Sequence, residues 1–237
     1  MLQKVLFILI VLVIFLSGYF YFIDPGNTET ENSPLPQNPS KYIWMDSNEE
    51  LELIQFNRDY SQGERMLIKT NFGNIKIVLY PEKAPKACEN FISLAKQGFY
   101  SGLKFDQPKE NYFIKSGDPK DGTGGRSIWD KPFPNEYSID LWNFRGAIGM
   151  VSSEKNKNGS QFYIICNNDI NEKMISDMEK AEFPQKVIDK YKEVGGAPWI
   201  DGKHTVFGHV VSGMDIVDRI SNNSSDEPAV IEEIIME

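Results

Sequence analysis

The sequence predicts a mainly β domain that carries a helical insertion and follows an apolar N-terminal segment. Three observations predict this arrangement. Short segments of alternating apolar and polar residues, the pattern of antiparallel strands, recur between residues 65 and 237. A stretch of helical periodicity interrupts them at residues 167–198, and an uncharged run at residues 5–23 precedes them. We therefore divide the chain into a segment 1–23, a linker 24–64 and a domain 65–237.

The apolar run predicts a transmembrane helix. Residues 5–23 contain no charge and, at about 1.5 Å per residue, are long enough to cross a bilayer. The run ends in the aromatic residues 19–22 rather than in a small-residue cleavage site, which indicates an uncleaved signal-anchor. Lys4 precedes the run and favours an orientation with the domain outside. We expect a single-pass protein of the cell membrane with an extracytoplasmic domain; a buried helix of a soluble core is the alternative.

The linker 24–64 has two parts of different composition. Residues 24–40 are rich in proline and lack an apolar run, so they cannot bury enough surface to fold and are expected to be extended. Residues 41–64 leave two alternatives open: they pack on the domain as a lead-in, or they stay loose.

The domain is expected to open with a β-hairpin and a helix. Strands at residues 66–70 and 75–80 flank an Asn/Gly turn. The helix follows over residues 84–98, with Pro85 in its first turn and Gly98 at its end.

The rest of the domain alternates further strands with helices. Residues 105–119 are typical of a short hairpin. In the insertion, Pro184 and Gly195 bracket a stretch with an apolar helical stripe. The remaining expected elements are strands at 146–151, 160–166, 204–211 and 229–237, and a short helix around Met214, Val217 and Ile220.

Composition and spacing exclude several classes of function. The net charge of -9 argues against nucleic acid as a partner. The histidines, His204 and His209, have no Cys or carboxylate at ligand spacing, so we expect no metal site and no cofactor. The glycine-rich residues 117–127 lack the Gly-Lys-Ser/Thr of a phosphate loop, which favours a surface loop. Cys88 and Cys166 lie in apolar patterns that favour two buried thiols over a disulfide.

Five separated blocks of the sequence resemble one family. They are TNFGNIKIVLYPEKAPKACENF, GDPKDGTGGRSIW, FRGAIGM, NGSQFYI and WIDGKHTVFGHVVSGMDIV, and their order and spacing are similar to those of the cyclophilins, the peptidyl-prolyl cis-trans isomerases. The resemblance runs from about Met66 to Glu237. It implies a closed eight-stranded antiparallel β-barrel capped by helices, and proline-containing polypeptides as partners. The insertion is similar to that of bacterial, often exported, members.

The resemblance also implies a site on one face of the barrel. A period of two places Gln161 and Tyr163 on one face of their strand, with Phe162 and Ile164 on the other. The resemblance implies catalytic roles for Gln107, Tyr112, Gln161 and His204, and substrate binding by Phe105, Phe113, Lys115, Ser152, Tyr163, Trp199 and Ile200.

Several of these positions depart from the family pattern. Gln107 replaces the Arg that is regarded as catalytic, Asp106 replaces a His, and Lys115 replaces a Gln. Residues 151–153 read Val-Ser-Ser where Ala-Asn-Ala is usual, and Tyr163 replaces a Phe. The sequence therefore predicts a proline-binding site whose strongest electrostatic group has been exchanged.

This exchange bears directly on the chemistry. Isomerisation of an X-Pro bond faces a barrier of about 18–20 kcal/mol from amide resonance. A catalyst needs an apolar pocket for the ring, hydrogen bonds that hold the amide, and a donor to the prolyl nitrogen. A neutral Gln is a weaker donor than an Arg. Lys115 could supply a positive charge in its place, but an ammonium lacks the bidentate geometry of an Arg guanidinium.

Three functions therefore stay open. The first is an extracytoplasmic isomerase of reduced activity that assists the folding of exported proteins. The second is a non-catalytic chaperone or scaffold module that binds proline-containing peptides. The third is a structural spacer in an envelope complex.

Overall fold

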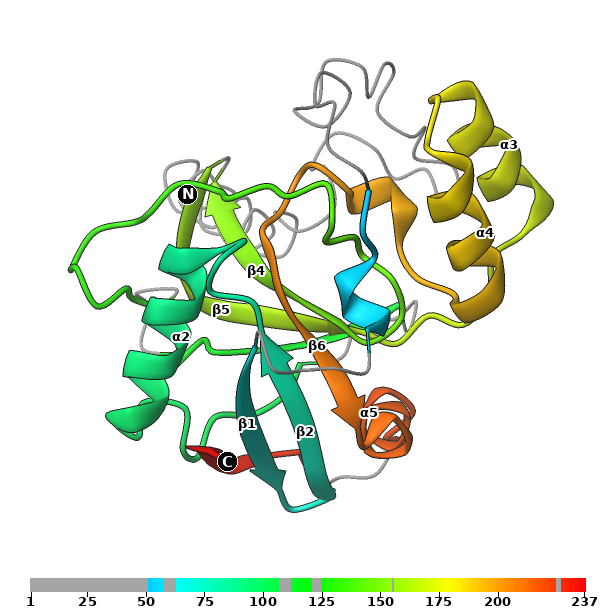
Figure 1. Cartoon of the computed structure of the whole chain (residues 1–237). Coiled ribbons are helices and arrows are strands. Elements are labelled where there is room, and N and C mark those ends of the chain that lie inside the picture. Colours follow the sequence, from blue (N-terminus) through cyan, green and yellow to red (C-terminus); the bar gives the residue numbers. More distant parts are fainter. Residues whose placement is uncertain (1–50, 58–62, 107–111, 121–124, 155, 225–226) are drawn as a thin grey trace, which may run out of the picture.

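The computed structural model describes residues 51–57, 63–106, 112–120, 125–154, 156–224 and 227–237 (Figure 1). Their main feature is a seven-stranded, wholly antiparallel sheet in the order β3-β5-β4-β6-β2-β1-β7. The strands are β1 (Glu64–Thr70), β2 (Gly73–Leu79), β3 (Phe113–Ser116), β4 (Ala147–Glu154), β5 (Lys157–Ile165), β6 (Val206–Ser212) and β7 (Ile231–Met236). This confirms the predicted mainly β class and each of the predicted strands.

The closed eight-stranded barrel goes beyond these seven strands and stays a prediction. The two edge strands are nevertheless linked by a short segment, because Lys104 bridges to Val230 beside β7 and Asp106 bridges to Lys115 of β3. The Asp106–Lys115 bridge is also the described part of the predicted 105–119 hairpin; residues 107–111 lie outside the described residues.

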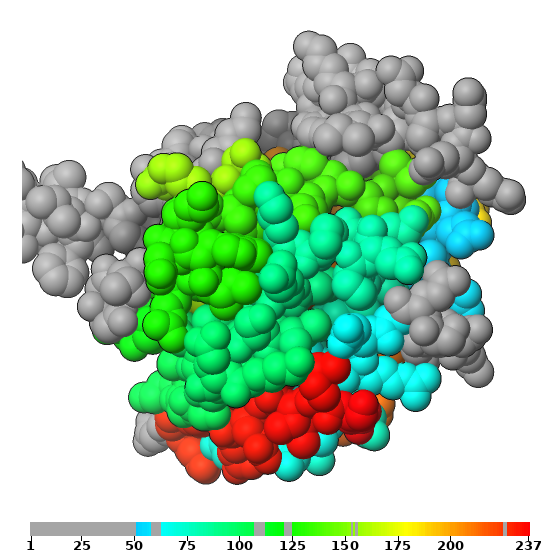
Figure 2. All heavy atoms as spheres, turned by 60° about the vertical axis from the view of Figure 1, so that its left-hand side comes forward, coloured from blue at the N-terminus to red at the C-terminus, as the bar shows by residue number. Residues whose placement is uncertain are grey.

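The helices lie in two places around the sheet. Helix α2 (Pro85–Lys96) packs against the sheet and lies beside β7 on the face that Figure 2 presents. Helix α5 (Met214–Ser221) follows β6. Helices α3 (Glu172–Lys180) and α4 (Gln185–Val194) pack together to one side (Figure 1), and short 3-10 turns η2 (Ile54–Phe56) and η4 (Pro198–Ile200) complete the described helices.

The predicted helical insertion is confirmed and is a pair of helices. Asn171 caps α3 by accepting a hydrogen bond from the Met174 backbone N–H at 2.9 Å. Pro184 directly precedes α4, and Gly195 with φ of 84° ends it, as the sequence predicted.

The two faces of the sheet bury different sets of side chains. Phe162 and Ile164 of β5 point into the interior core, where Phe91 of α2 meets Phe162 edge to face at 5.2 Å. Tyr163 and Ile165 point the other way into a second apolar cluster. This confirms the predicted alternation and makes the second cluster, on the outer face, the place to look for a site.

Part of the predicted linker packs on the domain. Gln55 is 1% exposed; its Nε2 donates to the Trp142 carbonyl at 3.0 Å and its Oε1 accepts from the Trp142 N–H at 2.8 Å. The Phe56 ring meets Phe144 edge to face at 5.2 Å. For residues 51–57, the packed alternative therefore holds.

The predicted transmembrane helix at residues 1–23 lies outside the described residues, as does the linker up to residue 50. Within the part of the chain that is described, no helix has both the length and the apolar character needed to span a bilayer. Cys88 and Cys166 are both free and buried, as predicted.

Candidate active site

The candidate site lies on the outer face of β3, β5 and β4. Strand register places Lys115 of β3 directly across from Tyr163 of β5, and Gly149 of β4 across from Tyr163 on its other side. Paired residues project their side chains on the same face, so Lys115 and Tyr163 are neighbours there. Phe113, two residues before Lys115, projects on this face as well.

Tyr163 is the centre of this face. Its side chain is fully buried, and the rings of Phe113 and His204 lie 6.2 Å and 6.1 Å from its ring. Ile200 of η4 belongs to the same buried cluster. A Cβ at Gly149 would lie 2.7 Å from Cε1 of Tyr163 and closer still to Cζ and Oη, so the ring lies over the bare backbone of β4.

Two further predicted residues form the edge of the cluster. The rings of Tyr112 and Trp199 meet edge to face at 4.9 Å, and both side chains are half-buried. Gln161, also half-buried, lies two residues before Tyr163 on the same face of β5. The structure thus brings an apolar aromatic floor together with an amide and an imidazole.

Two predicted residues are placed differently, and a third is not described. Phe105 is 5% exposed and belongs to the interior core, with its ring 6.2 Å from Phe162, so its side chain lies behind the outer face. The Ser152 hydroxyl is buried and donates to Asn158 Oδ1 at 2.8 Å, which commits it to an internal contact. Gln107, the substituted catalytic position, lies outside the described residues.

The charges next to the site are partly paired. Asp106, the neighbour of Gln107 in sequence, accepts from Lys120 Nζ at 2.8 Å. Burial lowers the pKa of Lys120, but the hydrogen bond and charge of Asp106 and the charge of Asp118 outweigh it, so this pKa is raised. Lys115, on the neighbouring strand, is a second cation of this region and lies on the outer face.

The histidine of the site is neutral at physiological pH. Burial, and to a smaller extent the charge of Lys203, lowers the pKa of His204 to about 4. His204 therefore contributes a neutral imidazole beside Tyr163 and no positive charge.

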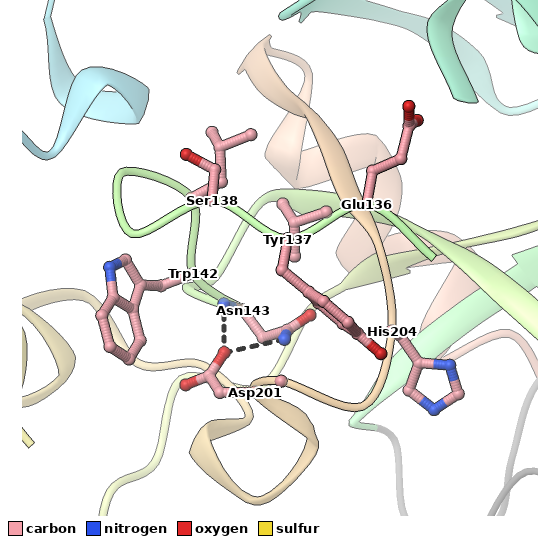
Figure 3. A pocket seen from close by; sticks show the side chains of 10 residues that line it. Glu136, Tyr137, Ser138, Trp142, Asn143, Asp201 and His204 are labelled. Carbon is pink, nitrogen blue, oxygen red and sulfur yellow. Dashed lines mark hydrogen bonds between the residues drawn. The ribbon is translucent and has the colours of Figure 1, made fainter. Parts of the chain in front are cut away.

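A buried polar network, which sequence reasoning missed, lies behind Tyr163. Tyr163 Oη donates to Asn143 Oδ1 at 2.6 Å. The backbone N–H and Nδ2 of Asn143 each donate to Asp201 Oδ1 at 2.8 Å (Figure 3), and Tyr191 Oη of α4 donates to Asp201 Oδ2 at 2.5 Å. The one signal in the sequence was Tyr163 itself, since a buried hydroxyl needs a partner.

The carboxyl of Asp201 is unusual in this network. Burial raises its pKa to about 7, although hydrogen bonds from Tyr191 and Asn143 favour the carboxylate. A small pocket of about 10 Å³, room for about one water, reaches Asp201 and Asn143 between Tyr137, Trp142 and His204 (Figure 3).

The fold and this face together define a class of protein. An antiparallel sheet whose outer face joins an aromatic floor to an amide and a neutral imidazole suits the prolyl ring and peptide group of an X-Pro segment, which is the site of a peptidyl-prolyl cis-trans isomerase. The model of the family "Cyclophilin type peptidyl-prolyl cis-trans isomerase/CLD" matches residues 65–237. The chain belongs to this family and is a cyclophilin-type peptidyl-prolyl cis-trans isomerase.

Curated relatives agree with this assignment. A protein of Staphylococcus aureus (strain USA300) named "Putative peptidyl-prolyl cis-trans isomerase" is 39% identical over 191 residues, which cover 77% of this chain and 97% of the relative. A protein of the same name from Staphylococcus saprophyticus is 38% identical over 170 residues, which cover 71% of this chain and 86% of the relative.

Solved structures agree as well. The crystal structure of a cyclophilin type peptidyl-prolyl cis-trans isomerase from Cryptosporidium parvum has a TM-score of 0.58 and 26% identity, and the match covers 74% of this chain and 98% of that one. The same protein in the presence of the dipeptide Ala-Pro has a TM-score of 0.57 and 27% identity, over 73% and 99% of the two chains.

Proposed function

We propose that this isomerase is a membrane-anchored, extracytoplasmic protein that binds proline-containing segments of exported polypeptides and assists their folding with reduced turnover. The observation that supports the binding part of the proposal is the apolar cluster of Phe113, Tyr163 and Ile200 beside His204 on the outer face. The structural neighbour studied with the dipeptide Ala-Pro supports a prolyl ligand for this family.

Each group has a role in this proposal. The half-buried rings of Tyr112 and Trp199, at the edge of the buried cluster, receive the prolyl ring, and Gln161 on the same face hydrogen-bonds the peptide group that stays fixed. Gln107 donates to the prolyl nitrogen as its conjugation is lost. Because deleting one preorganised donor costs about 10²–10³ in rate, and Gln lacks the charge of Arg, we expect turnover to be reduced by up to this factor.

Lys115 partly compensates for the missing Arg in this proposal. It lies across from Tyr163 in the strand register, on the face that binds the ring. Asp106, which bridges to Lys115 through the backbone, pairs its carboxylate with Lys120 at 2.8 Å. An ammonium on this face favours the electron pair that develops on the prolyl nitrogen, as a point charge without the Arg fork.

The test compares three variants of the full chain in an assay of cis-trans isomerisation of an Ala-Pro peptide. We expect Gln107→Arg to raise kcat/KM by about 10²-fold, since it restores a charged donor. Lys115→Ala is expected to lower kcat/KM, whereas Lys96→Ala, which removes an exposed lysine at the end of α2, serves as the matched control. Equal rates for the wild type and Lys115→Ala would remove Lys115 from the mechanism.

A second function, a non-catalytic proline-peptide-binding chaperone or scaffold, is favoured by Gln107 at the position of the catalytic Arg. The same assay separates the two. A wild type that binds the Ala-Pro peptide without accelerating its isomerisation, and a Gln107→Arg variant that gains no rate, would establish the binding module instead.

The membrane half of the proposal rests on the uncharged run at residues 5–23. We expect the full chain to remain in the membrane fraction after washing with high salt, and a chain that starts at residue 24 to leave it. Protease added to the outside of intact cells should degrade the domain; protection of the domain would reverse the proposed orientation.

The proposed closure of the barrel by residues 104–106 would fix the position of Gln107. The Phe105 N–H donates to the Ala229 carbonyl at 2.8 Å and the Asp106 N–H to the Lys115 carbonyl at 2.8 Å, as an eighth strand would. Slow amide hydrogen exchange at residues 105 and 106, similar to that in β3, is the expected signature.

A further inference from the structure

The hydroxyl of Tyr163 has no part in the chemistry of isomerisation. The reaction needs an apolar surface under the prolyl ring, which a phenyl group supplies, and the hydroxyl adds a polar atom inside a fully buried side chain. A buried hydroxyl without a partner is costly, so its hydrogen bond to Asn143 Oδ1 at 2.6 Å determines where the ring lies.

Side chains pack around this ring on every side except that of β4. The residue across from Tyr163 on β4 is Gly149, which offers no side chain on the side toward which the ring leans. On that side the ring lies against backbone, and its outer end is held through the hydroxyl. The position of the floor of the prolyl pocket therefore depends on Asn143.

The side chain of Asn143 is in turn oriented by Asp201. Asn143 Nδ2 and its backbone N–H both donate to Asp201 Oδ1 at 2.8 Å, so the amide oxygen is directed to Tyr163. The Asn143 carbonyl accepts from the Ala197 N–H at 2.8 Å, which fixes the backbone as well. Removing the Asp201 acceptor removes the reason for Asn143 to present its oxygen to Tyr163.

Asp201 also contacts the helical insertion. Its Oδ2 accepts from Tyr191 Oη of α4 at 2.5 Å. Tyr191 is fully buried between α4 and the domain, with its ring 4.5 Å from that of Phe144. The chain of contacts Tyr191–Asp201–Asn143–Tyr163 thus runs without a gap from the insertion to the pocket.

We propose that Asp201 is a positioning residue of the isomerase site: through Asn143 it sets the position of Tyr163, and through Tyr191 it makes that position depend on α4. This inference rests on the proposed function only in taking Tyr163 as the floor of the prolyl pocket. It makes the helical insertion a part of the active site that tunes affinity for the prolyl ring.

The experiment is a double-mutant cycle on the full chain with an Ala-Pro peptide. Asp201→Asn replaces the oxygen that accepts from Tyr191 with an amide donor and leaves only a weaker, uncharged acceptor for Asn143. We expect this substitution and Tyr191→Phe each to raise KM by about three- to tenfold with kcat changed less than twofold, which lies within the range of coupling between contacting residues. In a Tyr163→Phe background, the same two substitutions should change KM by less than about twofold, because a phenyl ring no longer depends on the network.

Asp140→Asn is the matched control. Asp140 is also a buried carboxylate, but it accepts from the Glu52 N–H at 3.1 Å and pairs with Lys83 at 2.7 Å, outside the network. Its substitution should leave KM unchanged in both backgrounds. If Asp201→Asn raises KM equally in the wild-type and in the Tyr163→Phe background, its role is only to stabilise the fold, and the proposal is overturned.

A second readout keeps this result separate from the proposed function. In a fluorotyrosine-labelled chain, the Tyr163 signal is identified by its loss in Tyr163→Phe, and Asp201→Asn should shift it, whether or not any peptide is bound. A wild type that neither binds nor isomerises the peptide would refute the proposed function alone. A Tyr163 signal that stays unmoved in Asp201→Asn and in the milder Tyr191→Phe would refute the positioning role.

Discussion

Gly149 is required because the ring of Tyr163 occupies the space that a side chain would need. A Cβ there would lie within 3 Å of two atoms of that ring and of its hydroxyl oxygen. We expect Gly149→Ala to lower the free energy of unfolding by about 1–3 kcal/mol, the usual cost of overpacking, and to weaken peptide binding as the ring is displaced. Urea unfolding and peptide titration of the same preparation measure both effects.

Gly159 of β5 supplies the matched substitution. A Cβ at this position would have no neighbour nearer than 3.7 Å, an ordinary contact. Gly159→Ala should therefore leave both stability and peptide affinity within experimental error of the wild type. If both variants lost the same stability and peptide affinity, the backbone of the strands, and not the Tyr163 ring, would be the reason that glycine is required.

At the residue scale, the sequence predicted the floor of the site better than its surroundings. Tyr163 could be placed on its face because alternation along a strand fixes the face of each side chain, whereas Phe113 was assigned through the resemblance. Phe105 was assigned through the resemblance, and its ring turns inward to Phe162 because its neighbour Asp106 bridges to Lys115 on the outer face. The partners of Tyr163 were out of reach, because Asn143, Asp201 and Tyr191 are brought together only by tertiary packing.

At the scale of the elements, the segment 51–57 acts as a clamp on the domain. The Gln55 side chain pairs with both the N–H and the carbonyl of Trp142 in a buried place. We expect Gln55→Ala to lower the free energy of unfolding by about 2 kcal/mol, since it removes two buried hydrogen bonds. Thermal unfolding, together with protease cleavage near residue 57, measures the loss.

Gln185 is the control for this change. It is an exposed glutamine whose Nε2 donates to Asp189 Oδ1 within α4 at 2.8 Å. Gln185→Ala should change stability by less than about 0.5 kcal/mol. A Gln55→Ala variant as stable as Gln185→Ala would show that the clamp adds no stability.

The elements also show where local sequence signals suffice. Pro184 and Gly195 marked α4 correctly, because a proline disfavours helical backbone in the residue before it and a glycine with positive φ ends a helix. Residues 51–57 carried no such signal: a three-residue 3-10 turn is held by Trp142 and Phe144, which are distant in sequence. Its packing could only be left as one of two alternatives.

At the scale of the whole molecule, buried titratable groups set the response to acid. Burial lowers the pKa of His209 from 6.5 to about 4, and its Nδ1 lies 3.3 Å from Gln55 Nε2. The unfolded chain therefore binds a proton more tightly than the folded one, so the stability is complete above pH 6.5 and is lost as the pH falls toward 4. In the protonated ring, Nδ1 of His209 carries a hydrogen, so two hydrogen-bond donors, Nδ1 and Gln55 Nε2, would face each other.

We expect His209→Gln to reduce the loss of stability as the pH falls. Between about pH 6.5 and 4.5 the variant should lose about 2 kcal/mol less stability than the wild type, since one group titrating across this window is worth about 1.4 kcal/mol per pH unit. Urea unfolding at half-unit steps measures the slope. Above about pH 7 the two curves should run parallel, and curves parallel over the entire range would contradict the assignment.

Asp201 acts in the opposite direction. Burial raises its pKa from 3.8 to about 7, so the folded state holds the proton more tightly, and the stability that this provides is complete below pH 3.8 and lost as the pH rises through 7. Asp201→Asn should therefore make the acid loss steeper than in the wild type.

The pairing of the first strand with the last one delays completion of the sheet during synthesis. Strand β1 pairs with β2 on one edge and with β7 on the other, and about 160 residues separate Thr70 from Ile231. At ribosomal rates, β1 is synthesised roughly 10 to 30 s before β7 becomes available to pair with it. During that time a newly synthesised copy of this isomerase exposes an unpaired strand edge, which needs protection from aggregation.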